Sequence, residues 1–374
     1  MKRLLIITDE EGHLLGKLFG TRENHASGDI FDINKCRKLF EQFGFCVTVK
    51  RYVDFDPRES YGGYFVIYSS SEDRGLFRKD YYEDVLLWLN NQGAVLIPRF
   101  ELFRAHHNKV YQEFMRGNFK DEMLRHPISY GVYNYKFIND INPNFPCVLK
   151  ASAGAGSRGV IMASDEKELL NSAKYLSKIK FYNFWYGTSA AIKDSKPYHM
   201  LRTIKKTILN EAKDEYKGSV LYNNKYIVQE FIDNLSGDYK VLFYYHKYYV
   251  LHRLNRDDDF RASGSGKFEF PQNEKEIIRV LEFAKRAVNE IDAPILSLDI
   301  GDDGKDCYLL EFQAVDYGNY TIQFSDCYFE FKDGKWTKTD VESDVEYEYC
   351  RSISQYIEDK HSVSRMIQDD GGLK

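Results

Sequence analysis

Short apolar runs alternate with amphipathic stretches over residues 1 to about 105. The runs have strand length and predict four strands, over Leu4–Thr8, Cys46–Tyr52, Tyr64–Ser69 and Ala94–Pro98. The stretches between them predict two helices, from Asp32 to about Gly44 and over Lys79–Gln92. Strands that alternate with helices are typical of a parallel sheet, so we expect a small, mainly parallel α/β domain.

The pattern changes after residue 105. Arg99 to about Arg125 is expected to be a helical link. Two predicted strands, Cys147–Lys150 and Val160–Ala163, then flank a glycine-rich turn. A helix is expected to start at Asp165 with Ser164 as its N-cap. Residues 179–225 are polar and rich in Tyr and Lys, which indicates an insertion with a helix over Tyr198–Ala212.

The C-terminal third is predicted to be rich in strands, with one long helix over Glu274–Ile291. The expected strands are Tyr226–Ile232, Tyr239–Tyr245, Tyr248–Leu254, Ile295–Ile300 and Cys307–Gln313. We therefore expect an N-terminal parallel α/β domain (1–105) followed by two α+β subdomains (106–225 and 226–374).

Length and composition exclude several classes of protein. A chain of 374 residues is too long for one ordinary core, and 43% hydrophobic residues are enough for two or three. The net charge of −5 comes without a basic segment, so nucleic acid is not an expected partner. The six scattered cysteines lack zinc spacing, and no apolar stretch has the length of a membrane span. These features indicate a reducing, cytoplasmic setting.

A glycine-rich loop is the first candidate for chemistry. Lys150 precedes Gly154, Gly156, Ser157 and Gly159. Glycines let backbone N–H groups approach phosphate oxygens without obstruction by a Cβ atom. A strand follows the loop where the dinucleotide fingerprint requires a helix, and no P-loop Lys-Ser/Thr is present. A flap over phosphates is the functional interpretation, and a plain hairpin turn with a solvated lysine is the alternative.

The hairpin around His246-Lys247 carries two cations on one face. A loop of two or four residues places Lys240 directly opposite Arg253, which is destabilising unless an anion lies between them. Leu242, Leu251, Tyr244 and Tyr249 are expected on the same face. The alternative is a different register with both charges solvated.

An acidic group follows in the next two strands. Glu311 and Gln313 share a strand face, and an odd-length loop such as Gly304–Asp306 places Asp299 opposite Glu311. Buried carboxylates need a counter-ion or a metal. Two carboxylates and an amide oxygen are hard ligands suited to Mg²⁺ with nucleotide phosphates.

The order of these features resembles a known superfamily. The series runs through Asn108-Lys109, Val148–Lys150 with the glycine loop, Val228–Ile232, Gly237–Lys240, Arg253, Phe260–Gly266, Asp299 and Glu311–Gln313. It closely resembles the ATP-grasp superfamily, in particular carboxylate–amine ligases of the ribosomal-S6-modifying and glutathione-synthetase type. The resemblance covers roughly residues 100–320, and residues 1–100 resemble the α/β domain that usually precedes this core.

The resemblance implies a role for each matching residue. The residues implied to bind the nucleotide are Lys109, Lys150, Gly154, Gly156, Ser157, Gly159, Gln229, Glu230, Phe231, Ile232 and Asp238. Lys240, Arg253 and Arg261 are implied to bind phosphate and the developing acyl phosphate. Asp299, Glu311 and Gln313 are implied to bind two Mg²⁺ ions, or Mn²⁺. Lys240 stands where these ligases commonly carry Arg, and Gln313 where they carry Asn. The segment 314–320 also departs from the family, so acceptor identity is not carried over.

The implied function is an ADP-forming ligase. It activates a carboxylate as an acyl phosphate and joins it to an amine, on small-molecule or peptide substrates. A kinase of the same fold and a nucleotide-binding regulator are the alternatives, and a homo-oligomer is left open. Three further features are expected to be structural or solvated: the adjacent pair His106-His107, the acidic run Asp257–Asp259 and the aromatic stretch Phe181–Tyr186. A gating or acceptor-binding role is the alternative for the acidic run, because it directly precedes Arg261.

Overall fold

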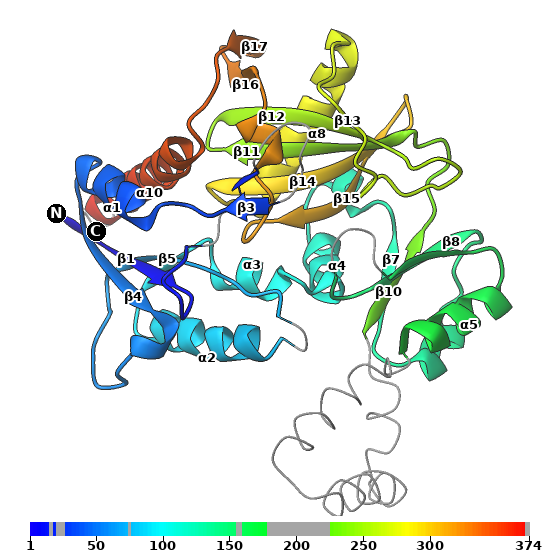
Figure 1. Cartoon of the computed structure of the whole chain (residues 1–374), viewed down its shortest axis with the longest axis horizontal. Coiled ribbons are helices and arrows are strands. Elements are labelled where there is room, and N and C mark those ends of the chain that lie inside the picture. Colours follow the sequence, from blue (N-terminus) through cyan, green and yellow to red (C-terminus); the bar gives the residue numbers. More distant parts are fainter. Residues whose placement is uncertain (15–17, 20–26, 74–75, 155–158, 178–224, 371–374) are drawn as a thin grey trace, which may run out of the picture. The chain divides into compact units, whose positions relative to one another are not determined.

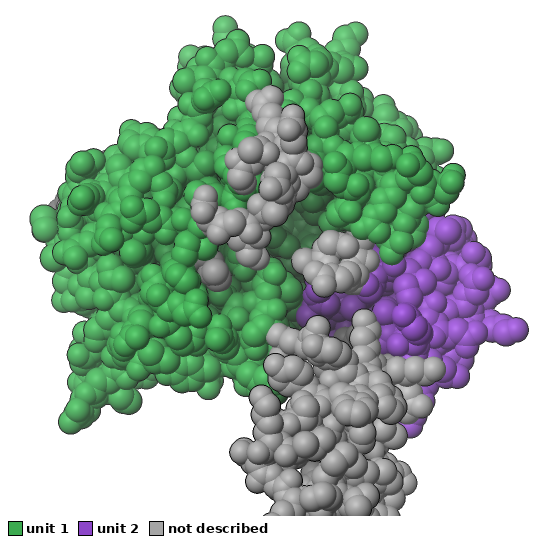
Figure 2. All heavy atoms as spheres, in the orientation of Figure 1, with its two compact units in different colours: residues 1–126, 233–374 green, residues 127–232 purple. Residues whose placement is uncertain are grey.

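The computed structural model describes residues 1–14, 18–19, 27–73, 76–154, 159–177 and 225–370. The chain divides into two compact units, coloured separately in Figure 2. Unit 1 combines Met1–His126 with Asp233–Lys374, and unit 2 is Pro127–Ile232. Unit 2 is therefore an insertion in the sequence of unit 1. The helix expected over Tyr198–Ala212 and the aromatic stretch Phe181–Tyr186 lie outside the described residues.

Unit 1 begins with a four-stranded parallel sheet in the order β4-β1-β5-β6 (Figure 1). Its strands are β1 (Lys2–Thr8), β4 (Phe45–Arg51), β5 (Phe65–Tyr68) and β6 (Val95–Ile97), and its helices are α1 (Ile33–Gln42) and α2 (Phe77–Asn91). Asp32 caps α1 as expected, because its side chain accepts from the amides of Asn34 and Lys35. The two faces of β1 enter different cores, which explains its uninterrupted apolar run.

The second sheet of unit 1 has seven strands, all paired antiparallel. Its main order is β15-β14-β11-β12-β16-β17, and β13 pairs with β12. The strands are β11 (Gly237–Tyr244), β12 (Lys247–Leu254), β13 (Phe268–Glu269), β14 (Ile295–Asp302), β15 (Cys307–Gln313), β16 (Cys327–Lys332) and β17 (Lys335–Asp340). The expected parallel domain followed by α+β structure is thus confirmed.

Helix α8 (Glu274–Ile291) covers one face of this sheet, with the bounds expected from its periodicity. Its buried residues join those of β11 at Tyr239, Val241 and Phe243 in one core. The alternate β11 positions, Leu242 and Tyr244, enter a second core shared with α1 and β1. Both faces of β11 are therefore buried, and its polar residues sit in an apolar setting.

Several elements of unit 1 were not predicted. The largest is α10 (Val345–Asp370), whose Cys350, Ile353 and Ile357 enter the core shared with α1. The Cys350 thiol donates to the Cys36 carbonyl, so α1 and α10 lie side by side (Figure 1). The short elements without a predicted counterpart are β2 (Leu18–Phe19), β3 (Ser27–Asp29), η1 (Tyr52–Asp54) and α9 (Tyr320–Gln323). The helical link expected from Arg99 to about Arg125 consists of α3 (Phe100–Ala105), α4 (Lys109–Gly117) and η2 (Glu122–Arg125).

Unit 2 is a four-stranded antiparallel sheet in the order β7-β10-β8-β9, with α5 (Glu166–Ser177) and η3 (Tyr135–Asp140). Its strands are β7 (Ser129–Val132), β8 (Cys147–Ala151), β9 (Val160–Ala163) and β10 (Tyr226–Glu230). The expected N-cap of α5 shifts by one residue. The side chain of Asp165, not Ser164, accepts from the first turn, at the amide of Glu168, and Glu168 accepts in return from the Ser164 amide.

The two units group residues differently from the three segments expected. Residues 106–126 lie in unit 1, and β10 lies in unit 2 because it pairs with β7 and β8. The division into residues 1–105, 106–225 and 226–374 therefore remains a prediction. Among the described helices, none combines the length and the apolar composition that a membrane crossing requires.

Candidate active site

The carboxylates Asp299 and Glu311 lie directly opposite each other on β14 and β15. The expected register is correct, but its cause is different. The loop between the strands has an even length, 303–306, and a bulge beside Asp299 inserts Leu310 and restores the pairing. Gln313 shares the face of Glu311 and donates to its Oε1 atom over 3.2 Å.

The hairpin of β11 and β12 brings a further acid–base pair to this face. The expected turn at His246-Lys247 is wrong by one residue at each end, because Tyr245 and His246 form the turn, both with positive φ. The register consequently shifts, and Arg253 lies opposite Asp238 rather than Lys240. Direct opposition of like charges is thus replaced by an ion pair, and both cations still point to one face.

A network of ion pairs crosses the sheet. The Nε atom of Arg253 lies 2.5 Å from Asp238 Oδ1, and its Nη2 atom lies 2.8 Å from Asp299 Oδ2. Lys109, the first residue of α4, places its Nζ atom 3.0 Å from Glu311 Oε1. We call this group the sheet cluster. It consists of Lys109, Asp238, Lys240, Arg253, Asp299 and Glu311.

Lys240 differs from the other cations of the sheet cluster. It is the cross-strand neighbour of Asp299, yet within the described part of the chain its ammonium makes no hydrogen bond and no ion pair within 4.0 Å. Burial lowers its pKa, and Asp299 compensates only in part. An anion that reached this face would therefore gain a partly desolvated cation as its partner.

Burial and neighbouring charges shift the pKa values of the other groups of the sheet cluster in opposite directions. Burial alone raises the pKa of Asp299, but Arg253 and Lys240 outweigh it, so this pKa lies below its usual value. Burial likewise lowers the pKa of Arg253, and Asp238 with Asp299 reverses the sign. Asp238 is the group for which burial wins, so its pKa is raised. Asp299 is therefore the more strongly ionised of the two aspartates.

The acidic residues fit a hard divalent cation. The ion pairs of the sheet cluster use Oδ2 of Asp299 and Oε1 of Glu311, so each carboxylate keeps one oxygen without a partner among the described residues. The two side chains are 21% and 22% exposed, respectively, so an ion can reach them. Mg²⁺ is commonly bound by one or two carboxylates, with substrate phosphates and waters completing its shell.

The expected nucleotide-binding residues of unit 2 lie on its sheet and at its ends. Lys150 on β8 is paired with Val160 and Ile227 in register, on the face opposite the core formed by Cys147 and Leu149. Gly159 has a φ of 81°, and a Cβ there would meet the Ala151 Cβ at 2.9 Å, so this position requires glycine. Gly154 also has positive φ. Gly156 and Ser157 lie outside the described residues.

The predicted hinge follows at the end of β10. The Gln229 side chain is buried and donates to Ser129 over 2.9 Å. The Glu230 amide donates to the Ile128 carbonyl, and its carboxylate accepts from the Ile128 amide at 3.3 Å. Phe231 and Ile232 follow as the last residues of unit 2. Their assignment to adenine remains a prediction.

Arg261 lies in the loop between β12 and β13 and is 30% exposed. Its guanidinium binds Asp259 in a bidentate manner: Nε donates to Oδ1 over 2.9 Å and Nη2 donates to Oδ2 over 2.6 Å. Asp257 pairs with Lys267 at 2.6 Å. Two members of the acidic run are thus paired within the loop, and Arg261 is not among the cations of the sheet cluster.

Comparison with known proteins adds fold-level similarities. No family model matches the sequence, and no curated protein matches it. Solved structures similar to this chain include an ATP-grasp RimK domain protein from Sphaerobacter thermophilus, with 10% identity, a TM-score of 0.44, and coverage of 84% of this chain and 92% of that chain. D-cycloserine synthetase DcsG matches with 13% identity, a TM-score of 0.48, and coverage of 94% and 99%.

N5-carboxyaminoimidazole ribonucleotide synthetase from Thermotoga maritima matches with 15% identity, a TM-score of 0.48, and coverage of 87% and 72%. Proteins of the ATP-grasp superfamily, which the sequence resembles, are thus among the similar structures. The activities of such distant structures belong to those proteins, so the function of this chain is inferred from its own side chains.

Proposed function

We propose that this chain is an ATP-dependent ligase that activates a carboxylate as an acyl phosphate and joins it to an amine. The sheet cluster carries the proposal. Three cations and three carboxylates meet on one face of four adjacent strands, and one of the cations, Lys240, has no direct partner in the described part of the chain. The phosphates of a nucleotide complement the cations of this surface, and a divalent cation complements its carboxylates.

Asp299, Glu311 and Gln313 would hold Mg²⁺. When bound, the ion neutralises charge on the phosphates during transfer. Lys240 and Arg253 would hold the phosphoryl oxygens, since positioning and electrostatics carry most of the catalysis of phosphoryl transfer. Arg253 is itself positioned by Asp238 at 2.5 Å, so its guanidinium has a defined direction.

The remaining predicted residues complete the proposal. Lys150 and the loop from Gly154 to Gly159 would contact the nucleotide phosphates, and Gln229 to Ile232 the adenine. Lys109 would hold Glu311 in place through the 3.0 Å ion pair. Arg261 would stabilise the oxyanion of the second step after exchanging its contact with Asp259.

The proposed reaction balances in two steps. A carboxylate oxygen attacks the γ-phosphorus, the bond to the β–γ bridging oxygen breaks, and ADP leaves. The amine then attacks the acyl carbon, inorganic phosphate leaves, and the amine loses a proton. The products are an amide, ADP and phosphate.

Phosphorus NMR of the full chain with Mg·ATP and a mixture of carboxylates and amines tests the proposal. We expect ADP and free phosphate to form only when both substrates are present, and Glu311→Gln to abolish the reaction. Glu330→Gln is the matched control, because Glu330 also lies on the seven-stranded sheet and pairs with a lysine, Lys332, at 2.8 Å.

The other outcomes are equally distinct. A new stable phosphorus signal beside ADP would identify a kinase instead of a ligase. Full activity of the Glu311→Gln variant would overturn the metal assignment. Binding of Mg·ATP without turnover by the wild-type chain would favour a nucleotide-binding regulator.

A further inference from the structure

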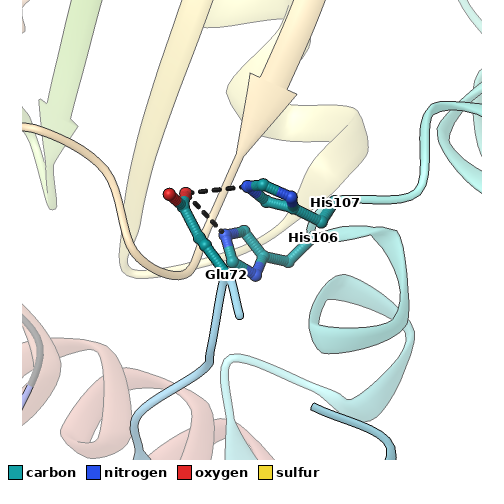
Figure 3. Close-up of side chains that lie close together, drawn as sticks. All are labelled: Glu72, His106 and His107. Atoms are coloured by element: carbon teal, nitrogen blue, oxygen red, sulfur yellow. Dashed lines mark ion pairs between the residues drawn. The ribbon is translucent and has the colours of Figure 1, made fainter. Parts of the chain in front are cut away.

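Three potential metal ligands converge in unit 1 outside the sheet cluster (Figure 3). Glu72 follows β5, and His106 and His107 lie between α3 and α4. One ligand atom of each side chain lies within 4.8 Å of the other two. The sequence predicts structural or solvated roles for the two histidines, because they are adjacent and do not have the i,i+4 spacing of a metal-binding pair. They lie beyond the end of α3, however, and the loop lets both rings turn toward Glu72.

His106 is the buried member of this group, which we call the histidine cluster. Its side chain is 0% exposed, and its Nε2 atom has no hydrogen-bond partner among the described residues. That atom lies 3.6 Å from Glu72 Oε1, beyond hydrogen-bonding distance. A buried polar nitrogen without a partner is costly, so its direction toward a carboxylate needs an explanation.

The other nitrogen of His106 supports a ligand role for Nε2. Nδ1 lies 2.7 Å from the hydroxyl of Ser70. If Nδ1 carries the proton and donates it to Ser70, the lone pair of Nε2 points at the histidine cluster. Histidine ligands of metals are oriented by such a contact on their second nitrogen.

His107 contacts the same carboxylate (Figure 3). Its φ of 53° lies in the left-handed region, which is uncommon for residues other than glycine. This conformation brings Nε2 to 2.8 Å from Glu72 Oε1, the atom that also faces His106. Two imidazoles thus converge on one carboxylate oxygen.

Two of the three ligand separations are close to those around a bound ion, and the third is no larger than 4.8 Å. Ligand atoms about 2 Å from a tetrahedral ion lie about 3.4 Å apart. The separations of 2.8 and 3.6 Å from Glu72 Oε1 bracket this value. Small rotations of the Glu72 side chain, which is 29% exposed, would equalise them.

We propose that Glu72, His106 and His107 form a binding site for a divalent transition-metal ion of the Zn²⁺ type. Two imidazoles and one carboxylate are ligands that Zn²⁺ accepts, with a fourth position left for water or a small molecule. The exposed side of Glu72 provides the access. The proposal is independent of the ligase function, because it uses none of the residues of the sheet cluster.

A second histidine–glutamate pair in unit 1 provides an internal control. His252 Nδ1 lies 2.8 Å from Glu269 Oε1, which is the same separation as in the His107–Glu72 pair. The His252 ring stacks on Tyr239 at 4.4 Å, and it is not a member of the histidine cluster. His252 and Glu269 therefore form the same kind of contact as His107 and Glu72, but without the second imidazole that the histidine cluster has.

Cobalt(II) titration of the chelator-treated full chain, in excess Mg²⁺, tests the site through the visible absorption of the bound ion. Competition with Zn²⁺ then gives its affinity. We expect one equivalent of Zn²⁺ to bind. Glu72→Gln and His107→Gln should each weaken binding at least about 100-fold, since loss of an outer-shell contact alone costs about 10- to 100-fold. Ser70→Ala should weaken it about tenfold. Glu269→Gln should leave it unchanged.

Two results would overturn the proposal. One is the absence of stoichiometric Co²⁺ and Zn²⁺ binding by the wild-type chain. The other is unchanged binding by Glu72→Gln and His107→Gln, which would place the ion elsewhere. Glu311→Gln separates the two sites: it should retain Co²⁺ binding at the histidine cluster even though it removes a proposed Mg²⁺ ligand. Circular dichroism of each variant reports whether it folds.

Discussion

The sheet cluster and the histidine cluster lie in the same unit but differ in how their buried polar groups are paired. In the sheet cluster, side chains from four adjacent strands sit at ladder spacing, and Arg253 joins two carboxylates. In the histidine cluster, loops bring two rings to one carboxylate, and the His106 Nε2 atom has no hydrogen-bond partner within the described residues. Charged groups joined in one network depend on one another, so the loss of Arg253 would affect both carboxylates that it contacts.

Arg253→Met should show the largest effect of this mutual dependence. It would leave Asp238 and Asp299 buried without their shared cation, and we expect the free energy of unfolding to fall by about 3–5 kcal/mol. Urea unfolding monitored by circular dichroism measures this. Lys338→Met is the control on the same sheet, where the exposed pair with Asp340 should contribute less than about 1 kcal/mol. Equal losses in the free energy of unfolding for the two variants would contradict the mutual dependence of the charges in the sheet cluster.

Lys240→Met should separate stability from binding within the sheet cluster. Lys240 has no direct partner in the described part of the chain, so the free energy of unfolding should change by no more than about 1 kcal/mol. Affinity for Mg·ATP, measured by calorimetry, should nevertheless fall at least about tenfold, or about 1.4 kcal/mol. Unchanged affinity would remove Lys240 from the proposed phosphate site.

Glu72→Gln should have the smallest effect on folding. Its contact with His107 is partly exposed, and in metal-free protein the loss should stay below about 1 kcal/mol in the same urea experiment. A loss as large as that of Arg253→Met would mean that the histidine cluster is a structural ion pair like the sheet cluster. The contrast between the two clusters would then fail.

Local patterns predicted most of the elements near the sheet cluster. Helix α8 has the expected bounds, and Asp299 faces Glu311 as expected, although a bulge rather than an odd loop produces the register. The hairpin register was wrong because neither turn residue, Tyr245 nor His246, is a glycine or an asparagine, the usual signals of a turn with positive φ.

Other features carried signals that were missed. The Asp333-Gly334 step between alternating strands indicates the β16–β17 hairpin. The spacing of Cys350, Ile353 and Ile357 is that of an apolar helix face and indicates α10. The histidine cluster had no such signal, because Glu72 lies far from the histidines in sequence and only the tertiary fold brings them together.

The division of unit 1 by unit 2 has a consequence for biosynthesis. The core that contains Phe40 of α1 also contains Ile353 and Ile357 of α10, so it lacks part of its apolar partner until these two residues have left the ribosome. Unit 2 is continuous in sequence and has a core of its own. Since domains fold as units during translation, unit 2 is expected to fold before the unit that begins ahead of it. During that interval the part of the α1 surface that packs on α10 would remain uncovered, and it is an apolar surface that a chaperone can bind.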